Sequence, residues 1–174
     1  MAAVVVEYKH DQNKGRLFMS FTVRYADHGD EGKIAELLVA IHAQHAKGRP
    51  DLFGKGHAKY DADAVRGMFH DPTAPMLVAA TDDGVLGYVI CKLIKNHNPA
   101  QGEYTTLYID DLNVDAAARR MGVGRALMDA CRKLAKEENC FNITLNVWAF
   151  NEGAIAFYEN CGFSVQRMIL EEIL

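Results

Sequence analysis

The chain has 174 residues, of which 49% are hydrophobic and 24% charged, and its formal net charge is -4. This length suits one ordinary domain, and these fractions are typical of a globular protein rather than a disordered or fibrous one. The 23 acidic residues outnumber the 19 basic ones, so no broad cationic surface is expected for a nucleic-acid backbone. We therefore expect one globular domain that binds no nucleic acid.

The cysteines and the apolar runs indicate in which cellular compartment the protein is expected. The four cysteines have neither C-x-x-C spacing nor a dense framework, which argues against a zinc ribbon and a disulfide scaffold. The N-terminal apolar run at residues 2–6 is too short for a signal peptide, and nowhere do about 18 apolar residues occur in a row. The prediction is a soluble cytoplasmic protein without a membrane partner.

The N-terminal part of the chain predicts one strand and two helices. Residues 1–18 are weakly patterned, and we predict an extension of little functional weight before a domain that spans residues 19–174. A strand is predicted at about residues 20–25, followed by a helix from its N-cap Asp30 to about Ala46, because apolar residues recur there at spacings of three and four. A second, short helix is predicted over Asp61–His70, which Asp71-Pro72 ends.

The middle of the chain has the composition of strands. A short apolar run, Met76–Ala80, is separated from a second run, Val85–Ile94, by the turn signal Asp82-Asp83-Gly84. A polar loop then leads to a third segment, at about Tyr104–Val114. Three neighbouring antiparallel strands are expected.

From Gly122 onward, apolar residues recur again at helical spacing, which predicts a helix. Strand and helix segments alternate after it. A strand is predicted over Phe141–Ala149, a helix over Asn151–Cys161 that Gly162 ends, and a last strand over Phe163–Ile173. The predicted order is β-α-α-β-β-β-α-β-α-β. This is a mixed α/β fold without the strict alternation of a doubly wound one.

The turn between the third middle strand and the helix after it carries Gly122 and Gly124. Backbone amides in the first turn of a helix lack internal partners and lie at its positive end, so this turn is suited to hold a phosphate. Three arginines add charge that suits a pyrophosphate, namely Arg119, Arg120 and Arg125. A dinucleotide motif would need a third glycine where Leu127 stands, and a P-loop would need a Gly-Lys-Ser/Thr ending.

These residues resemble the GNAT superfamily of acetyltransferases, whose signature R/Q-x-x-G-x-G/A is filled by Arg119, Gly122 and Gly124. A second resemblance lies in residues 151–163, where Asn151 opens a helix and Tyr158 follows an aromatic residue. The resemblance covers about residues 20–174. It implies the GNAT fold, with a mixed, mostly antiparallel sheet of six to seven strands flanked by about four helices. It also implies direct transfer of an acetyl group from acetyl-CoA to an amine, and a homodimer.

The resemblance also implies which residues hold acetyl-CoA. Strand backbone would bind the pantetheine arm as an added strand, which requires the sheet to splay, and the amides of residues 120–125 would bind the pyrophosphate. The implied cofactor residues are Leu112, Asn113, Val114, Arg119, Arg120, Met121, Gly122, Val123, Gly124, Arg125, Asn151 and Ala154. Tyr158 would protonate the departing thiolate. By sequence pattern alone, Asn151 is a helix cap and Tyr158 a core aromatic residue.

Asp110 and Asp111 are unusual in a predicted strand, where aspartate is disfavoured and a buried carboxylate is costly unless paired. Alternation along the strand would put them on opposite faces, so one would face the acetyl group. Residues 108–112 resemble the Tyr-Leu-Glu-Asp-Phe run of diamine and polyamine acetyltransferases. This implies a small-molecule primary amine as acceptor, with Asp110 catalytic and Asp111 in contact with the substrate. Alternatively, one aspartate is exposed and the other binds backbone amides.

Further residues near the expected acceptor pocket are open to more than one interpretation. His45, Arg49 and Tyr60 are predicted to contact the substrate, because GNAT enzymes commonly shape the acceptor pocket with this helix and loop. A metal site of His42, His45 and His57 would lack a fourth ligand, so no metal is predicted.

Three further functions stay open beside transfer to a small-molecule amine. The first is acetylation of a protein N-terminus. In enzymes that acetylate a protein N-terminal alanine, a catalytic Glu occupies the position of Asn146, which disfavours that acceptor. The second is acetylation of a protein lysine, and the third is a non-catalytic acyl-CoA-binding module, because a fold by itself does not prove activity.

Overall fold

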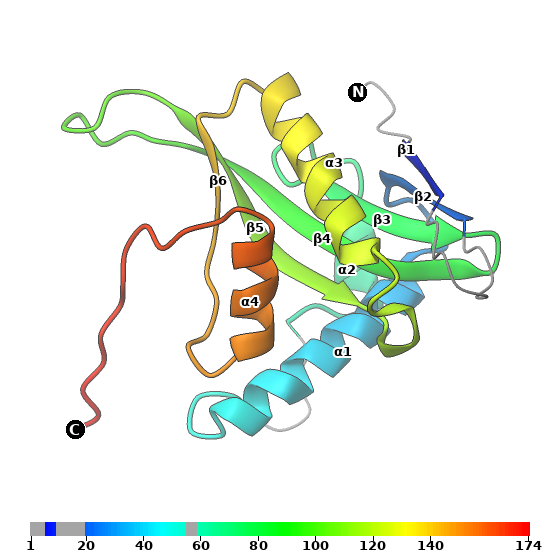
Figure 1. Ribbon diagram of the computed structural model, residues 1–174, viewed down its shortest axis with the longest axis horizontal. Helices are drawn as coiled ribbons and strands as arrows, with labels where there is room; N and C mark the ends of the chain where they lie inside the picture. The colour runs from blue at the N-terminus through cyan, green and yellow to red at the C-terminus, as the bar shows by residue number, and fades with distance from the viewer. Residues whose placement is uncertain (1–5, 10–19, 55–58) are drawn as a thin grey trace.

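A computed structural model of the protein describes residues 6–9, 20–54 and 59–174. Figure 1 shows one sheet with helices on both faces. His57 and most of the predicted extension lie outside the described residues. The elements in chain order are β1 (Val6–Lys9), β2 (Ser20–Tyr25), α1 (Glu31–Gly48), α2 (Ala62–Met68), β3 (Met76–Thr81), β4 (Gly84–Lys95), β5 (Thr105–Val114), the 3₁₀ turn η1 (Ala116–Ala118), α3 (Val123–Glu137), β6 (Asn142–Leu145) and α4 (Glu152–Asn160).

The described residues form a six-stranded sheet in the order β1-β2-β3-β4-β5-β6. Every neighbouring pair is antiparallel except β5 and β6, which are parallel. Five strands, β2 to β6, come from segments in which the sequence predicts strands, and the four α-helices are those expected. The remaining strand, β1, comes from the N-terminal extension, and its Tyr8 ring stacks on Phe21 at 5.6 Å.

The strand predicted over Phe163–Ile173 is wrong, because residues 163–174 form no regular element. This segment leaves α4 and ends beyond the loop that follows α1 (Figure 1), where Glu171 pairs with Arg49 at 2.8 Å. Its side chains from Val165 onward are exposed, including six large apolar ones. An apolar sequence becomes a strand only where a sheet edge receives its backbone hydrogen bonds.

Two cores hold the helices against the sheet. One lies between the sheet and α3, and Phe157 and Tyr158 of α4 pack against it. The other lies between the opposite face and helices α1 and α2, with Tyr88 fully buried in it. Among the described residues, no helix combines the length and the apolar character that a membrane span needs.

Side-chain caps mark the starts of two helices. Asp61 and Asn151 cap α2 and α4, and their side chains accept hydrogen bonds from the amides of Ala64 and Ala154. Asp30 precedes α1 but makes no capping bond. Its buried carboxylate instead binds the guanidinium of Arg24 at 2.6 Å.

Strand β5 is irregular where the sequence has its two aspartates. Its register with β4 shifts, because Asp111 lies opposite Ile90 and Ile109 lies opposite Cys91, so Asp110 is an extra, bulged residue. On the other edge, β5 and β6 pair only from Thr106 to Ile109, which lies opposite Leu145. Residues 110–114 therefore have no strand on that edge, and the splay that the resemblance implied is confirmed.

The bulge also decides which way the aspartates face. Ile109, Leu112 and Val114 pack in the α3 core, whereas Asp111 accepts a hydrogen bond from Tyr88 in the α1–α2 core. Asp110 is bound on the same face by Tyr60, which also packs against that core. The expected placement on opposite faces is wrong, because a bulge adds one residue and interrupts the alternation.

Candidate active site

The open edge of β5 presents unpaired backbone groups. The amide of Asp115 donates to Leu86 of β4 at 2.8 Å, so by alternation Leu112 and Val114 direct their amides and carbonyls away from β4. The amide of Val114 donates to the Asn113 side chain at 2.9 Å, and its carbonyl accepts from Arg119 at 3.2 Å. The amide and carbonyl of Leu112 are therefore the groups left on this edge for an added strand.

Asn113 belongs to the scaffold of this edge as well as to the predicted cofactor residues. Its buried side chain donates to the carbonyl of Leu37 at 2.8 Å and so ties α1 to the end of β5. Its side-chain oxygen at the same time accepts from the amide of Val114. A side chain with these two bonds serves to fix the edge, and the Asn113 backbone points toward β4.

The turn before α3 has the geometry of an anion site. Arg120 and Gly122 both have positive φ, 65° and 83°, and Gly122 is the N-cap of α3. Alternating conformations of this kind gather successive amides into a concave nest, to which the first turn of α3 adds its free amides. Met121 and Val123 are the other members of this turn.

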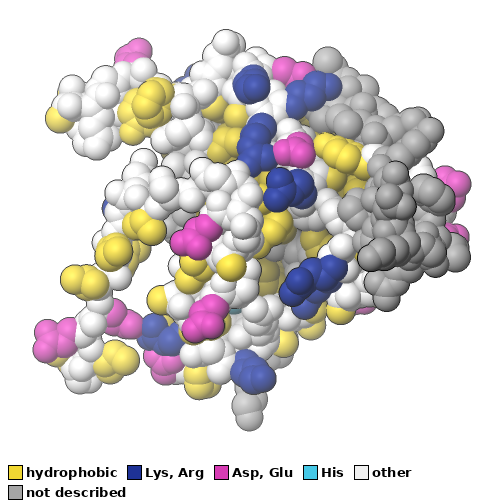
Figure 2. All heavy atoms as spheres, in the orientation of Figure 1, with side chains coloured by type: hydrophobic (Ala, Val, Ile, Leu, Met, Phe, Trp, Pro, Cys, Tyr) yellow, Lys and Arg dark blue, Asp and Glu magenta, His cyan; other side chains and the backbone are white. Residues whose placement is uncertain are grey.

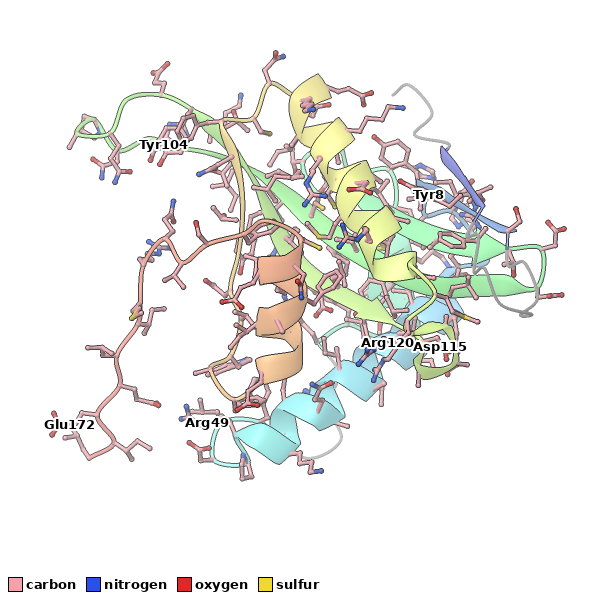
Figure 3. The ribbon with its side chains drawn as sticks, in the orientation of Figure 1. Tyr8, Arg49, Tyr104, Asp115, Arg120 and Glu172 are labelled. Carbon is pink, nitrogen blue, oxygen red and sulfur yellow. The ribbon has the colours of Figure 1, made fainter. Side chains whose placement is uncertain are left out.

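Arginine side chains surround this turn. Three of these arginines are exposed and make no ion pair with another described residue. They are Arg119, Arg120 and Arg125. Figure 2 shows basic side chains over α3 and near its start, and in Figure 3 Arg120 lies at the N-terminal end of α3. Their charges are available to a pyrophosphate.

Gly124 lies where three predicted cofactor segments meet. A Cβ at this position would stand 3.2 Å from the ring of Phe157 in α4 and 3.8 Å from the Val114 side chain. The start of α3, the second half of α4 and the end of β5 thus come together. Asn151 lies apart from this junction, at the start of α4 beside Gln44 of α1.

Asn151 and Tyr158 lie on α4 beside the open edge. The Asn151 side chain caps Ala154 at 3.2 Å and accepts a second hydrogen bond from Gln44 of α1 at 3.3 Å. The Tyr158 ring packs between Phe157 and Phe163. Burial, and then the negative charge of Asp111, raise the pKa of Tyr158. Its phenol therefore keeps its proton at neutral pH.

Asp110 is the centre of an ion-pair cluster. Its side chain is 8% exposed, and its two oxygens bind the ammonium groups of Lys59 at 2.6 Å and Lys92 at 3.0 Å. Tyr60 donates to the oxygen that Lys59 also binds, at 3.5 Å. Burial alone would raise the pKa of Asp110, but the hydrogen bonds from both lysines outweigh it and lower the pKa. Asp110 is therefore an anion that binds ammonium groups.

Asp111 has a different environment. Its carboxylate accepts a hydrogen bond of 2.7 Å from the buried Tyr88 hydroxyl. Burial raises the pKa of Asp111, and the bond from Tyr88 offsets only part of that effect. A carboxylate with a raised pKa is a better proton acceptor than an ordinary one, and perturbed groups of this kind are common at active sites.

Of the other predicted substrate residues, only Tyr60 joins the acidic pair. His45 lies against Phe53 with ring centroids 5.2 Å apart. Arg49 binds Asp51 and Glu171 and lies over the Trp148 ring, at 5.7 Å. His45 and Arg49 are therefore part of a cluster at the end of α1 and have other partners than the aspartates.

The described residues do not test the prediction that the protein needs no metal. His42 contacts the carbonyl of Gly54 at 2.8 Å, and His57 lies outside the described residues. Within the described ranges, the one group of three possible metal ligands is Asp27, His28 and His70, all exposed. The absence of a metal requirement stays a prediction.

Sequence reasoning missed Lys59, Lys92 and Tyr88. Lys92 left a signal, because it interrupts the apolar run of β4. Lys59 lies in a loop and Tyr88 resembles any core tyrosine, so neither position carried a signal. The bulge at Asp110, which brings all three to the acidic pair, has no signature in the sequence.

Comparison with known proteins agrees with this site. The profile of the acetyltransferase (GNAT) family matches residues 39–163. The chain belongs to the acetyltransferase (GNAT) family. It is thus an acyltransferase that acetylates an amine, and the family implies acetyl-CoA as the donor.

Individual GNAT relatives differ in what they acetylate. The peptidyl-lysine N-acetyltransferase YjaB of Escherichia coli is 30% identical over 148 residues, 84% of each chain. The catalytic subunit naa20 of the N-terminal acetyltransferase B complex of Schizosaccharomyces pombe is 30% identical over 90 residues, and the match spans about half of each chain, 52% of this one and 47% of naa20. A solved mutant of the BH1408 protein from Bacillus halodurans shares the fold with a TM-score of 0.82 and 27% identity, covering 87% of this chain and 98% of that one.

Gly124→Val is expected to weaken acetyl-CoA binding by about tenfold or more, because its side chain would press on Phe157 and displace the amides at the start of α3. Isothermal titration calorimetry measures the affinity. Gly67→Val is the matched control, since a Cβ at this exposed glycine of α2 meets nothing within 4 Å. Equal acetyl-CoA affinities for Gly124→Val and the wild type would remove this turn from the cofactor site.

Proposed function

We propose that the protein transfers the acetyl group of acetyl-CoA to the primary amine of a small cationic molecule, either polyamine- or diamine-like or amino-acid-like. The observation that carries this proposal is the pair Asp110 and Asp111, which face the same side of the sheet beside the open edge of β5. Asp110 already binds two alkylammonium groups of the chain itself. A free primary ammonium is the same chemical group.

The donor brings an activated thioester, and the chain supplies binding and proton transfer. The open amide and carbonyl of Leu112 are able to bind the pantetheine arm as an added strand. Burial and Asp111 raise the pKa of Tyr158, so its phenol is protonated when the thiolate departs, and we assign it the role of proton donor. The arginines and amides before α3 would hold the pyrophosphate at the other end of the arm.

We assign different parts to the two aspartates. An alkylamine has a pKa near 10 and an ordinary carboxyl group one near 4, a gap of roughly six units or about 8 kcal/mol that makes direct proton abstraction unfavourable. Asp110, whose pKa is lowered, suits the binding of the ammonium. Asp111, whose pKa is raised, suits the acceptance of its proton, directly or through water. The sequence suggested the reverse assignment, in which Asp110 is catalytic and Asp111 contacts the substrate.

A lysine side chain of a protein is the second candidate acceptor. Similarity to YjaB over most of both chains favours it, and a lysine offers the same primary ammonium as a diamine. A protein N-terminus is less favoured, because Asn146 stands where a catalytic Glu is expected and its amide binds the Tyr108 hydroxyl at 3.1 Å. The homodimer stays a prediction.

Tyr158→Phe is expected to lower kcat by about 10² to 10⁴ while acetyl-CoA affinity changes little, because the substitution removes only the proton donor. Steady-state kinetics with spermidine as acceptor, together with calorimetric titration, measure both quantities. Tyr104→Phe is the matched control, since Tyr104 lies at the far end of β5 and its hydroxyl binds only Gln101 among the described residues. An unchanged kcat in Tyr158→Phe would show that another group protonates the thiolate.

Asp110→Asn is expected to raise the KM for a primary amine most at low pH, where the acceptor is an ammonium ion. The loss, about tenfold or more near pH 6, should shrink toward pH 10 as the free amine fraction rises. Asp111→Asn is expected to lower kcat, because the proton acceptor is lost. Kinetics of both variants across this pH range provide the measurement.

The matched control for the acidic pair is Asp83→Asn in the turn between β3 and β4, where Asn-Gly suits a hairpin turn. Its kinetics should follow the wild type at every pH. If Asp110→Asn and Asp111→Asn also keep wild-type rates throughout, the acidic pair is structural and the proposed acceptor class loses its support.

A further inference from the structure

Lys59 occupies the carboxylate that we assign to the acceptor. Lys59 lies in the loop between α1 and α2. Its ammonium nitrogen lies 2.6 Å from the Asp110 carboxylate, and its side chain is 45% exposed. The same carboxylate oxygen accepts from Tyr60 at 3.5 Å, and the Lys59 nitrogen lies 5.3 Å from the centre of the Tyr60 ring. A primary ammonium thus already lies on the acidic pair, held by a carboxylate, a hydroxyl and an aromatic face.

Lys59 is better situated for the reaction than Lys92, the other lysine on Asp110. Lys92 reaches the opposite carboxylate oxygen from within β4, whereas Lys59 lies in a loop that carries its side chain across to β5. The charges of Asp110 and Asp111 both act on Lys59, and the charge of Asp111 also acts on Tyr158. Asp111 is therefore within electrostatic reach of both Lys59 and Tyr158.

We propose that Lys59 is an internal acceptor, acetylated by the active site of its own chain when no amine occupies the pocket. This inference rests on the proposed function. A bond forms between the Lys59 nitrogen and the acetyl carbon while the carbon–sulfur bond of the thioester breaks. The Lys59 nitrogen loses two protons, one before and one after the attack, and both pass through the acidic pair to solvent. The thiolate takes a proton from Tyr158, which regains one from solvent. The products are N-acetyl-Lys59, the free thiol of coenzyme A and one proton.

Acetylation of Lys59 would change the site that performs it. An amide nitrogen carries no charge, so Asp110 would lose one of its two ion pairs and become more available to an external ammonium. External amines and Lys59 compete for the same carboxylate. An added primary amine should therefore slow the modification of Lys59.

The test uses the full-length protein, incubated with acetyl-CoA and no acceptor, followed by intact-mass measurement and peptide mapping. Lys33 is the internal control, because it also pairs with an aspartate, Asp115 at 2.7 Å, and has a side chain that is 30% exposed. Lys59 is expected to gain its acetyl group about tenfold faster than Lys33 or more, because it is held at the site. The rate per chain should not depend on protein concentration, and spermidine should lower it.

Two variants complete the experiment. Lys59→Arg should abolish the dominant modification, and Tyr158→Phe should slow modification of Lys59 without changing that of Lys33. Acetylation of Lys59 no faster than of Lys33, or at the same rate in Tyr158→Phe, would overturn the inference. Turnover of spermidine while Lys59 stays unmodified would also overturn it, yet leave the proposed function standing. If neither spermidine nor Lys59 is acetylated, both proposals fail.

Discussion

The separation of β5 from β6 beyond Ile109 and Leu145 is the constraint on which the rest of the site depends. If β6 paired with β5 as far as the end of β5, the amide and carbonyl of Leu112 would be hydrogen-bonded to β6. Because the pair stops, these groups have no strand partner on that edge among the described residues. The bulge at Asp110 begins where the pairing ends, so one irregular stretch opens the edge and turns both aspartates toward α1 and α2.

The charges are arranged along β5 in the order that the reaction needs. The C-terminal end of β5 leads to the amides and unpaired arginines before α3, which suit the phosphates of the donor. The bulge carries the acidic pair, which suits a cationic acceptor. The open edge lies between the two. Charges of opposite sign thus lie at the two ends, as the proposed donor and acceptor require.

Local signals in the sequence predicted most of the elements and the cofactor end of the site. Gly122, Asn151 and Gly162 mark helix boundaries through their own backbone or side-chain chemistry, and all three lie at such boundaries in the structure. The acceptor end could not be predicted in the same way. The bulge at Asp110 depends on the register between two strands, and Lys59 reaches Asp110 across 51 positions of sequence. The last predicted strand is wrong because residues 163–174, although they have strand composition, pair with no edge of the described sheet.

The central claim is that the pantetheine arm adds to the open edge of β5 through Leu112. Amide hydrogen exchange followed by NMR, with and without saturating coenzyme A, tests it most directly. The amide of Leu112 should become protected by about tenfold or more on binding, since a bonded amide exchanges only when it opens. The amide of Asn113, which by alternation points toward β4, should change little and serves as the neighbouring control. An unchanged exchange rate at Leu112 in the saturated protein would contradict the account.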